Sequence, residues 1–205
     1  MALIHRATLR PTKLELIAAW LPGRPWFAGP AGDLERLAAY RFDDPAGEVG
    51  IETILVGTAR GTFQVALTYR GAPLAGGEDL LVGTTEHSVL GRRWVYDAVG
   101  DPVYAAALTA AVLADAGQAT EFLEAGDRLE PRDPSMTIAG TTAGGSAAPT
   151  AVRRVVDGDP TVIETDTVDL ALARRLDAPR LTGAVLTGTW PGRDTPVALA
   201  SASPR

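Results

Sequence analysis

The sequence contains no cysteine, which removes several kinds of chemistry at the outset. Disulfide bridges, thiolate nucleophiles and cysteine-ligated zinc sites are excluded. Histidine is almost as scarce, because only His5 and His87 occur, and a metal site built on both would have to join distant segments. No G-x-x-x-x-G-K-[ST] loop, G-x-S-x-G elbow or H-E-x-x-H pair is present either. We therefore expect no metal, no cofactor and no catalytic residue of a familiar type.

Basic charge is also limited. The formal net charge of −6 argues against proteins that neutralise nucleic-acid phosphates or dock on anionic membranes. Lys13 is the only lysine, so a single side-chain amine is available for a Schiff base or a phosphate clamp. The longest apolar run, residues 103–114, is too short to span a bilayer, and the N-terminus has no apolar signal-peptide core. These features predict a cytoplasmic protein without nucleic-acid or membrane partners.

A capping box marks the start of the first predicted helix. Thr12 is a suitable N-cap and Glu15 stands three residues later. The apolar positions that follow share one helical face, and they are Leu14, Ile17, Ala18 and Leu21. Pro22 and Gly23 end the pattern.

Two aromatic residues, Trp26 and Phe27, follow this helix inside a turn rich in proline and glycine. One interpretation is that the turn folds back and the two rings cover the apolar face of the helix. The other is that they form a platform on which a ligand stacks. We favour the packing interpretation and keep both residues as candidate binding residues.

Strand patterns come next. Residues 36–42 and 49–57 are rich in apolar residues and are separated by a turn cluster at 43–47. Residues 61–70 alternate between apolar and polar side chains, which predicts a half-buried antiparallel strand. Three strands in this order predict a small antiparallel sheet with helices packed on one face. Residues 84–97 fit either a short helix or a strand.

Asp101 and Pro102 form a helix start, and the predicted helix continues to about residue 116. We expect a further short helix at 120–125 and a linker at 126–150, where glycine, proline, serine and threonine accumulate. Short β patterns then appear at 151–156, 161–165, 181–190 and 196–201, with a charged helix expected at 169–176. The prediction is an α+β fold with a helix-on-sheet domain at 1–125, a linker at 126–150 and a smaller β-rich part at 151–205.

Candidate functional groups cluster between residues 86 and 94. Glu86, His87 and Ser88 are consecutive, but neighbours in sequence point in different directions on any regular element, so adjacency does not make a triad. His87 is more readily explained as a structural hydrogen-bonding group than as a base. Arg92 and Arg93 precede Trp94 and are suited to binding an anion or a sugar. The alternative is a solvated pair that forms salt bridges to Glu86 or Asp97.

The segment "LELIAAWLPGRPWFAG" at 14–29 resembles the start of the N-terminal cap domain of actinobacterial maltokinases and related aminoglycoside-kinase-like sugar kinases. The positions that carry the resemblance are Trp20, Leu21, Pro22, Arg24, Trp26, Phe27 and Gly29. The resemblance extends to about residue 117 and implies a cystatin-like sheet with a helix packed on it. Pro25 and Pro30 depart from the family pattern.

The resemblance does not extend to the catalytic parts of those kinases. Such an enzyme needs a phosphate loop, an ATP-binding lysine and catalytic and metal-binding aspartates. Residues 140–152, "GTTAGGSAAPTAV", are at best a degenerate phosphate loop, and no lysine follows them. The chain therefore looks like a stand-alone cap, with residues 151–205 as a possible remnant of the kinase small lobe, and no catalytic residue carries over.

Three functions are compatible with these observations. The first is a non-catalytic binding or regulatory module in α-glucan, trehalose and maltose metabolism, whose partner is an enzyme of that metabolism or an α-glucan. The ligand- or partner-binding candidates are Trp26, Phe27, His87, Arg92, Arg93 and Trp94. The second is a small enzyme with an unrecognised site near Glu86, His87 and Arg92. The third is a structural or oligomerising protein that associates through sheet edges.

Overall fold

Two six-stranded antiparallel sheets contain most of the strands in the computed structural model, which describes residues 2–4, 7–125, 128–141 and 148–205. The first sheet has the order β2-β6-β7-β5-β4-β3. Its strands are β2 (Leu9–Arg10), β3 (Glu35–Phe42), β4 (Gly50–Thr58), β5 (Gly61–Arg70), β6 (Leu81–His87) and β7 (Gly91–Asp97). Neighbouring strands are mostly joined by short connections, as is usual for antiparallel sheets.

The second sheet has the order β10-β14-β15-β13-β12-β11. Its strands are β10 (Thr137–Ala139), β11 (Val152–Val156), β12 (Thr161–Thr165), β13 (Val168–Leu172), β14 (Ala184–Trp190) and β15 (Arg193–Pro204). A third, smaller sheet contains β1 (Ala2–Ile4), β8 (Glu121–Ala125) and β9 (Arg128–Pro131). The expectation of an antiparallel sheet accompanied by helices and a β-rich C-terminal part is confirmed.

Helix α1 (Lys13–Trp20) packs against one face of the first sheet, and the predicted capping box is present. The Thr12 hydroxyl accepts a hydrogen bond from the Glu15 amide, and the Glu15 carboxylate accepts one from the Thr12 amide at 2.7 Å. These two bonds satisfy amides that have no partner within the helix, which fixes where the helix begins. The buried residues of this layer include Ile17, Ile54 and Val65.

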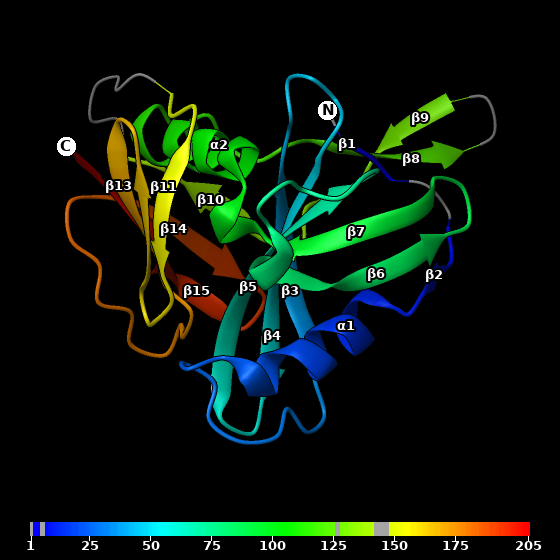
Figure 1. Cartoon of the computed structure of the whole chain (residues 1–205), viewed down its shortest axis with the longest axis horizontal. Helices are drawn as coiled ribbons and strands as arrows, with labels where there is room; N and C mark the ends of the chain where they lie inside the picture. The colour runs from blue at the N-terminus through cyan, green and yellow to red at the C-terminus, as the bar shows by residue number, and fades with distance from the viewer. Residues whose placement is uncertain (1, 5–6, 126–127, 142–147) are drawn as a thin grey trace.

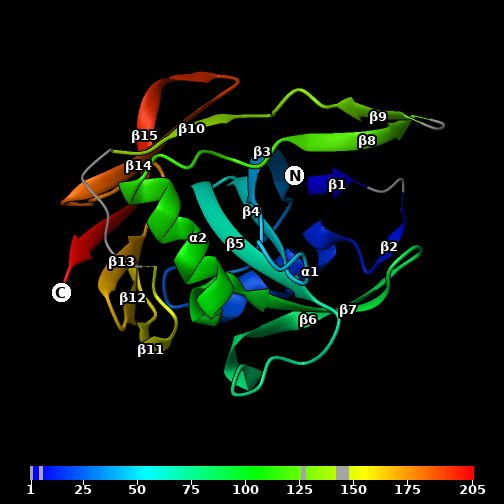
Figure 2. The ribbon, with the colours of Figure 1, turned by 90° about the horizontal axis from the view of Figure 1, so that it is seen from above.

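Helix α2 (Pro102–Leu113) lies between the first sheet and the second (Figures 1 and 2). One hydrophobic cluster joins Tyr40 and Leu55 of the first sheet, Leu108 of α2, and Leu170 and Leu199 of the second sheet. The prediction of helices on one face only is therefore wrong. The first sheet is covered on both faces, by α1 on one side and by α2 with the second sheet on the other.

Burial on both faces also changes the description of β5. The prediction of a half-buried strand is wrong, because Gln64, Ala66 and Thr68 on its supposed outer face are fully buried, like Val65 and Leu67 on the other. Polar residues on a strand usually indicate a solvated face. Here they face a second layer of protein.

Three local predictions also need correction. Residues 84–97 form the hairpin of β6 and β7, which settles the open choice in favour of strand. Residues 120–125 are not a helix, because Glu121–Ala125 form β8, which pairs in parallel with β1 from the other end of the chain. Residues 169–176 are not a helix either. Leu170 and Leu172 are buried in β13, and the residues that alternate with them are less buried, which is the period of two that a strand has. The run of alanine and leucine also fits a helix, so this period was not recognised from the sequence.

The predicted linker at 126–150 contains both β9 and β10, while residues 126–127 and 142–147 lie outside the described residues. The division into folding units at 1–125 and 151–205 stays a prediction. In the structure, residues of both parts share one hydrophobic cluster. None of the helices in the described part of the chain is long and apolar enough to cross a membrane.

Candidate functional site

The hairpin of β6 and β7 carries the polar candidates predicted from the sequence. Glu86 and Arg92 are directly opposite each other on the two strands, and their side chains form a salt bridge of 3.1 Å. Both side chains are about 60% exposed, at 63% and 60%. The Arg92 guanidinium also lies 6.0 Å from the centre of the Trp94 ring. The pair is thus a solvated salt bridge, which was the alternative to an anion- or sugar-binding role for Arg92, and such pairs contribute little to stability.

His87 and Arg93 hold the loop that joins the two strands. The His87 Nδ1 accepts hydrogen bonds from the amides of Val89 and Leu90, at 3.2 and 3.1 Å. Arg93 donates a hydrogen bond of 2.8 Å to the Leu90 carbonyl oxygen. The loop is therefore fixed by side chains from both strands, while Val89 and Leu90 are 57% and 45% exposed.

These groups do not line either of two cavities in the described part of the chain. The smaller cavity, of about 160 Å³, lies on the second sheet beside Asp169, Arg180 and Ser201. The larger lies beside α2. Convergence of Glu86, His87 and Arg92 on an enclosed pocket would have favoured a small enzyme, and neither cavity provides it. Among the residues that the structure describes, no three His, Asp or Glu side chains are placed to hold a metal ion.

Trp26 and Phe27 lie against the first sheet, as the packing interpretation predicted. Their exposed fractions are 7% and 2%. The Phe27 ring meets the Phe63 ring edge-on at 4.8 Å, and the Trp26 ring meets Trp20 at 5.8 Å. The turn thus covers the end of α1 with aromatic contacts, which prefer such edge-on geometry. Ligand binding by these two residues, or by His87, Arg92, Arg93 and Trp94, stays a prediction.

Trp26 also contacts the second sheet through polar groups. Its indole Nε1 donates a hydrogen bond of 2.8 Å to Asp157, in the loop after β11. The Arg174 guanidinium lies 4.8 Å from the centre of the indole ring. A tryptophan of the cap-like turn is thereby tied to two residues from the last quarter of the chain.

Arg174 is fully buried and is paired with Asp97 at the end of β7. The distance from Arg174 Nη2 to Asp97 Oδ2 is 2.6 Å, and Arg174 Nε donates to the Thr161 hydroxyl at 2.8 Å. Burial raises the pKa of Asp97, and the neighbouring guanidinium offsets part of this effect. This pair was not predicted, because residues 169–176 were expected to form a helix and nothing in the local sequence distinguishes Arg174 from the exposed Arg175 beside it.

Gln64 and the segment after β13 complete the junction between the two sheets. The Gln64 side-chain amide donates to the carbonyl oxygens of Ala173 and Leu199, at 2.8 and 2.9 Å. The backbone of residues 174–176 pairs with the beginning of β5, through Gln64 N to Arg174 O and Leu176 N to Thr62 O. The polar face of β5 therefore serves as a fixed contact between the sheets and leaves no open surface for a ligand.

The only lysine takes part in a second buried charge cluster, beneath α1. One oxygen of Glu52, on β4, accepts from Lys13 Nζ at 2.5 Å and from the Tyr69 hydroxyl at 3.0 Å. Arg41 lies 3.2 Å from the same oxygen and also contacts Glu121 of β8 at 3.3 Å. Lys13 thus joins α1 to the sheet, a role that its sequence position did not reveal.

The acid stability of the protein should depend measurably on Glu52. Burial alone would raise the pKa of Glu52, but Arg41 and Lys13 outweigh burial and lower it from 4.5 to about 2. A carboxylate with a lowered folded-state pKa stabilises the protein above its unfolded pKa, and this contribution disappears as the pH falls from about 4.5 to about 2. We expect a loss of about 3 kcal/mol over this range. Urea unfolding of the wild type and Glu52→Gln at several pH values measures it, and parallel curves for the two proteins would contradict it.

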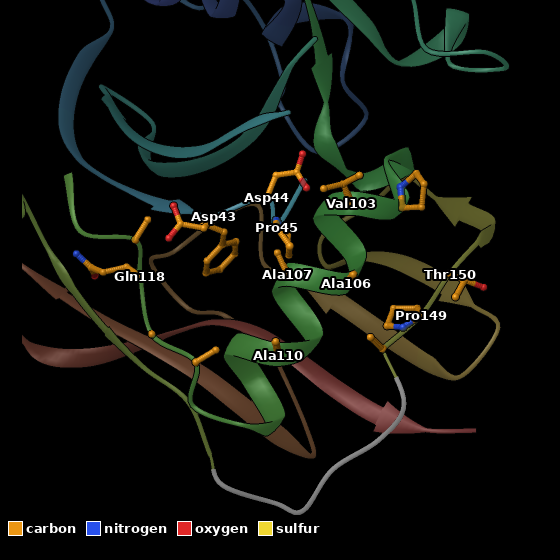
Figure 3. A pocket seen from close by; sticks show the side chains of 16 residues that line it. Asp43, Asp44, Pro45, Val103, Ala106, Ala107, Ala110, Gln118, Pro149 and Thr150 are labelled. Carbon is orange, nitrogen blue, oxygen red and sulfur yellow. The ribbon is translucent and has the colours of Figure 1, made fainter. Parts of the chain in front are cut away.

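A groove of about 590 Å³ lies along the exposed side of α2 (Figure 3). Its wall is an alanine-rich face of the helix, and Phe42 and Pro149 are among the other apolar groups. Asp43 and Asp44 are its only charged residues. The lining residues are Phe42, Asp43, Asp44, Pro45, Pro102, Val103, Ala106, Ala107, Ala110, Ala116, Gly117, Gln118, Ala119, Ala148, Pro149 and Thr150.

The polar side chains of this groove are engaged in local structure. Asp44 accepts hydrogen bonds from three amides of its own turn, including that of Ala46. Gln118 bonds the backbone of Met136 and Ile138. The groove therefore presents an apolar surface with negative charge at one side, and its chemistry suits association rather than catalysis.

Comparison with known proteins agrees with the features of the first sheet. The family model for the maltokinase N-terminal cap domain matches residues 20–101, which run from the end of α1 through β7 to the N-cap of α2. No curated protein matches the chain. The resemblance drawn from the aromatic turn is confirmed. Residues 20–101 of this chain are therefore similar to the maltokinase N-terminal cap domain, over less than half of the chain.

Proposed function

We propose that the protein is a non-catalytic binding module of α-glucan, trehalose and maltose metabolism that acts through a partner enzyme. The observation that carries the proposal is the match of residues 20–101 to the maltokinase N-terminal cap domain. It is supported by the buried charged side chains, which form ion pairs inside the protein. The buried charges Glu52, Asp97 and Arg174 are all engaged in ion pairs within the fold. We include in the proposal a cytoplasmic location and a cystatin-like character for the cap, which the packing of α1 on an antiparallel sheet supports.

A protein partner accounts for the surface better than an oligosaccharide does. Sugar rings are usually bound on exposed aromatic faces, and aromatic side chains also stack on cations and on one another. Trp20, Trp26 and Trp190 are buried at 7–8% exposure. Only Trp94 is partly accessible, and Arg92 lies over it. The exposed large apolar residues are aliphatic, which is typical of contact with another protein rather than with a sugar.

Phosphoryl transfer is not part of the proposed function. That reaction requires metal ions and fixed cations around the transferred phosphoryl group. The single lysine is bonded to Glu52, and the only charged residues of the large groove are acidic. Neither arrangement is suited to holding the phosphates of ATP.

The proposal is tested by measuring three properties of the purified protein. Biolayer interferometry against a purified maltokinase and a purified trehalose-to-maltose isomerase should show saturable binding to at least one enzyme. Affinity electrophoresis in glycogen should show no retardation. Incubation with ATP, magnesium and maltose should give no phosphorylated sugar above a control without protein.

Each result discriminates between the candidate functions. Retardation in glycogen that disappears in Trp94→Ala would replace the enzyme partner by a glucan. Magnesium-dependent, saturable phosphorylation would overturn the non-catalytic assignment. Absence of binding to both enzymes, with a folded protein, would count against the proposed partner class.

A further inference from the structure

The loop between β6 and β7 and the groove beside α2 are both apolar and carry charges of opposite sign. The loop, which we call the hairpin tip, comprises residues 87–93 and projects from one end of the molecule (Figure 1). Val89 and Leu90 are its exposed apolar residues. The groove is an apolar hollow of about 590 Å³. Exposed apolar surface of either kind is a common sign of association.

Charge at the two surfaces is opposite in sign. Arg92 and Arg93 lie in the hairpin tip, and Arg10 of β2 stands opposite Glu86 at its base. This gives three cationic groups against one carboxylate, in a chain whose net charge is −6. The groove has Asp43 and Asp44 and no cationic residue in its lining. A basic, apolar projection therefore matches an acidic, apolar hollow.

The hairpin tip is also prepared for binding. His87 and Arg93 fix the loop from both sides through the hydrogen bonds to Val89 N, Leu90 N and Leu90 O. A loop that is already ordered loses less conformational entropy on association than a flexible one. The cost of presenting two aliphatic side chains to a partner is correspondingly low.

Both surfaces belong to one chain but lie far apart on it. In two perpendicular views, the loop joining β6 and β7 is at one end and α2 is towards the other, across the first sheet (Figures 1 and 2). The tip of a molecule therefore does not reach its own groove. It can enter only the groove of a second copy.

We propose that this protein associates with itself head to tail, with the hairpin tip of one copy seated in the α2 groove of the next. Such a contact joins two different surfaces, so it is heterologous and generates chains or rings rather than a closed symmetric pair. The proposal is independent of the proposed function, because it concerns binding of a second copy rather than of an enzyme. It differs from association through sheet edges, since no strand pairing is involved.

Sedimentation velocity tests this contact with two variants that block opposite sides of it. Leu90→Asp places a charge in the hairpin tip, and Ala107→Arg fills the groove from the exposed face of α2. The wild type should show a weight-average mass that rises with concentration up to about 1 mM, the weak end of specific association. Each variant alone should sediment as a single chain at every concentration.

The decisive sample is an equimolar mixture of the two variants. Leu90→Asp retains an intact groove and Ala107→Arg retains an intact tip, so the mixture should form dimers and no larger species. Val156→Asp is the matched control, because Val156 is also an exposed apolar residue, at 40%, but lies on β11 outside both surfaces. It should associate like the wild type. Thermal melting shows whether each variant is folded, and Leu90→Ser and Ala106→Arg replace any variant that is not.

Other outcomes overturn the proposal. A wild type that remains a single chain over the whole range removes it directly. A mixture that stays monomeric, while the wild type associates, would show that a different contact is responsible. Association of the wild type that Val156→Asp abolishes would instead place the contact at the β11 edge.

Discussion

Replacing Trp26 with alanine should destabilise the protein by about 3–5 kcal/mol, the usual cost of deleting a large buried ring. Its indole fills the space between α1, Phe63 and the second sheet, and only 7% of it is exposed. The substitution also removes the Nε1 donor from Asp157 and the aromatic surface beneath Arg174. For a chain of this size we expect the melting temperature to fall by roughly 6–20 °C.

Two controls separate the contributions to this effect. Trp26→Phe keeps an aromatic ring but loses the hydrogen bond to Asp157, so its melting temperature should lie between those of the wild type and Trp26→Ala. Trp94→Ala removes a tryptophan that is only partly buried and should cost less than Trp26→Ala. Calorimetry of the four proteins measures these differences. An unchanged melting temperature for Trp26→Ala would refute the packing role of the aromatic turn.

Breaking the buried pair of Arg174 and Asp97 should have an effect of similar size. Arg174→Met leaves the Asp97 carboxylate buried without its cation, and removing one partner of such a pair typically costs about 3–5 kcal/mol. Chemical unfolding monitored by tryptophan fluorescence provides the measurement. The loss of stability is expected because Asp97 is only 3% exposed. Without Arg174, water cannot solvate the buried carboxylate in place of the lost cation.

The double variant Arg174→Met/Asp97→Leu tests that explanation. Replacing a buried ion pair by apolar residues of similar volume is often neutral, so the double variant should recover much of the stability lost in Arg174→Met. A matched surface control is Arg92→Met, which breaks the exposed pair with Glu86 and should change the free energy of unfolding by under about 1 kcal/mol. If the double variant is no more stable than Arg174→Met, the loss comes from packing of the arginine stem rather than from the unpaired carboxylate.

Local patterns predicted the parts of the fold that depend on neighbours in sequence. The capping box placed the start of α1, Asp101 and Pro102 placed that of α2, and alternation identified β5. The prediction of a helix at 120–125 was wrong because β8 is stabilised by parallel pairing with β1, more than 100 residues away in sequence. Local propensity contains no information about such a distant partner. The prediction that one face of β5 is exposed to solvent was wrong for a similar reason. The Gln64 side chain on that face donates hydrogen bonds to the carbonyl groups of Ala173 and Leu199, which are distant in sequence.

In the candidate site, too, contacts between residues close in sequence were predicted and contacts between distant residues were not. The pairing of Arg92 with Glu86 follows from a spacing that a hairpin brings together, and it was among the alternatives considered. Asp97 was considered as a partner for the exposed arginines, but it is paired with Arg174, 77 residues away in sequence. The groove beside α2 had no sequence signal, because its wall is made of alanines that also suit an ordinary helix.

The pairing of residues 174–176 with the beginning of β5 has a consequence for synthesis of the protein. The other strands of the first sheet are complete once residue 97 has been made, but the edge at Thr62 and Gln64 finds its partners only in Arg174 and Leu176. A chain emerging from the ribosome therefore carries an unpaired strand edge while residues 98–173 are being made. Unpaired edges favour aggregation, so the nascent first sheet is open to edge-to-edge association until Arg174 and Leu176 have been made.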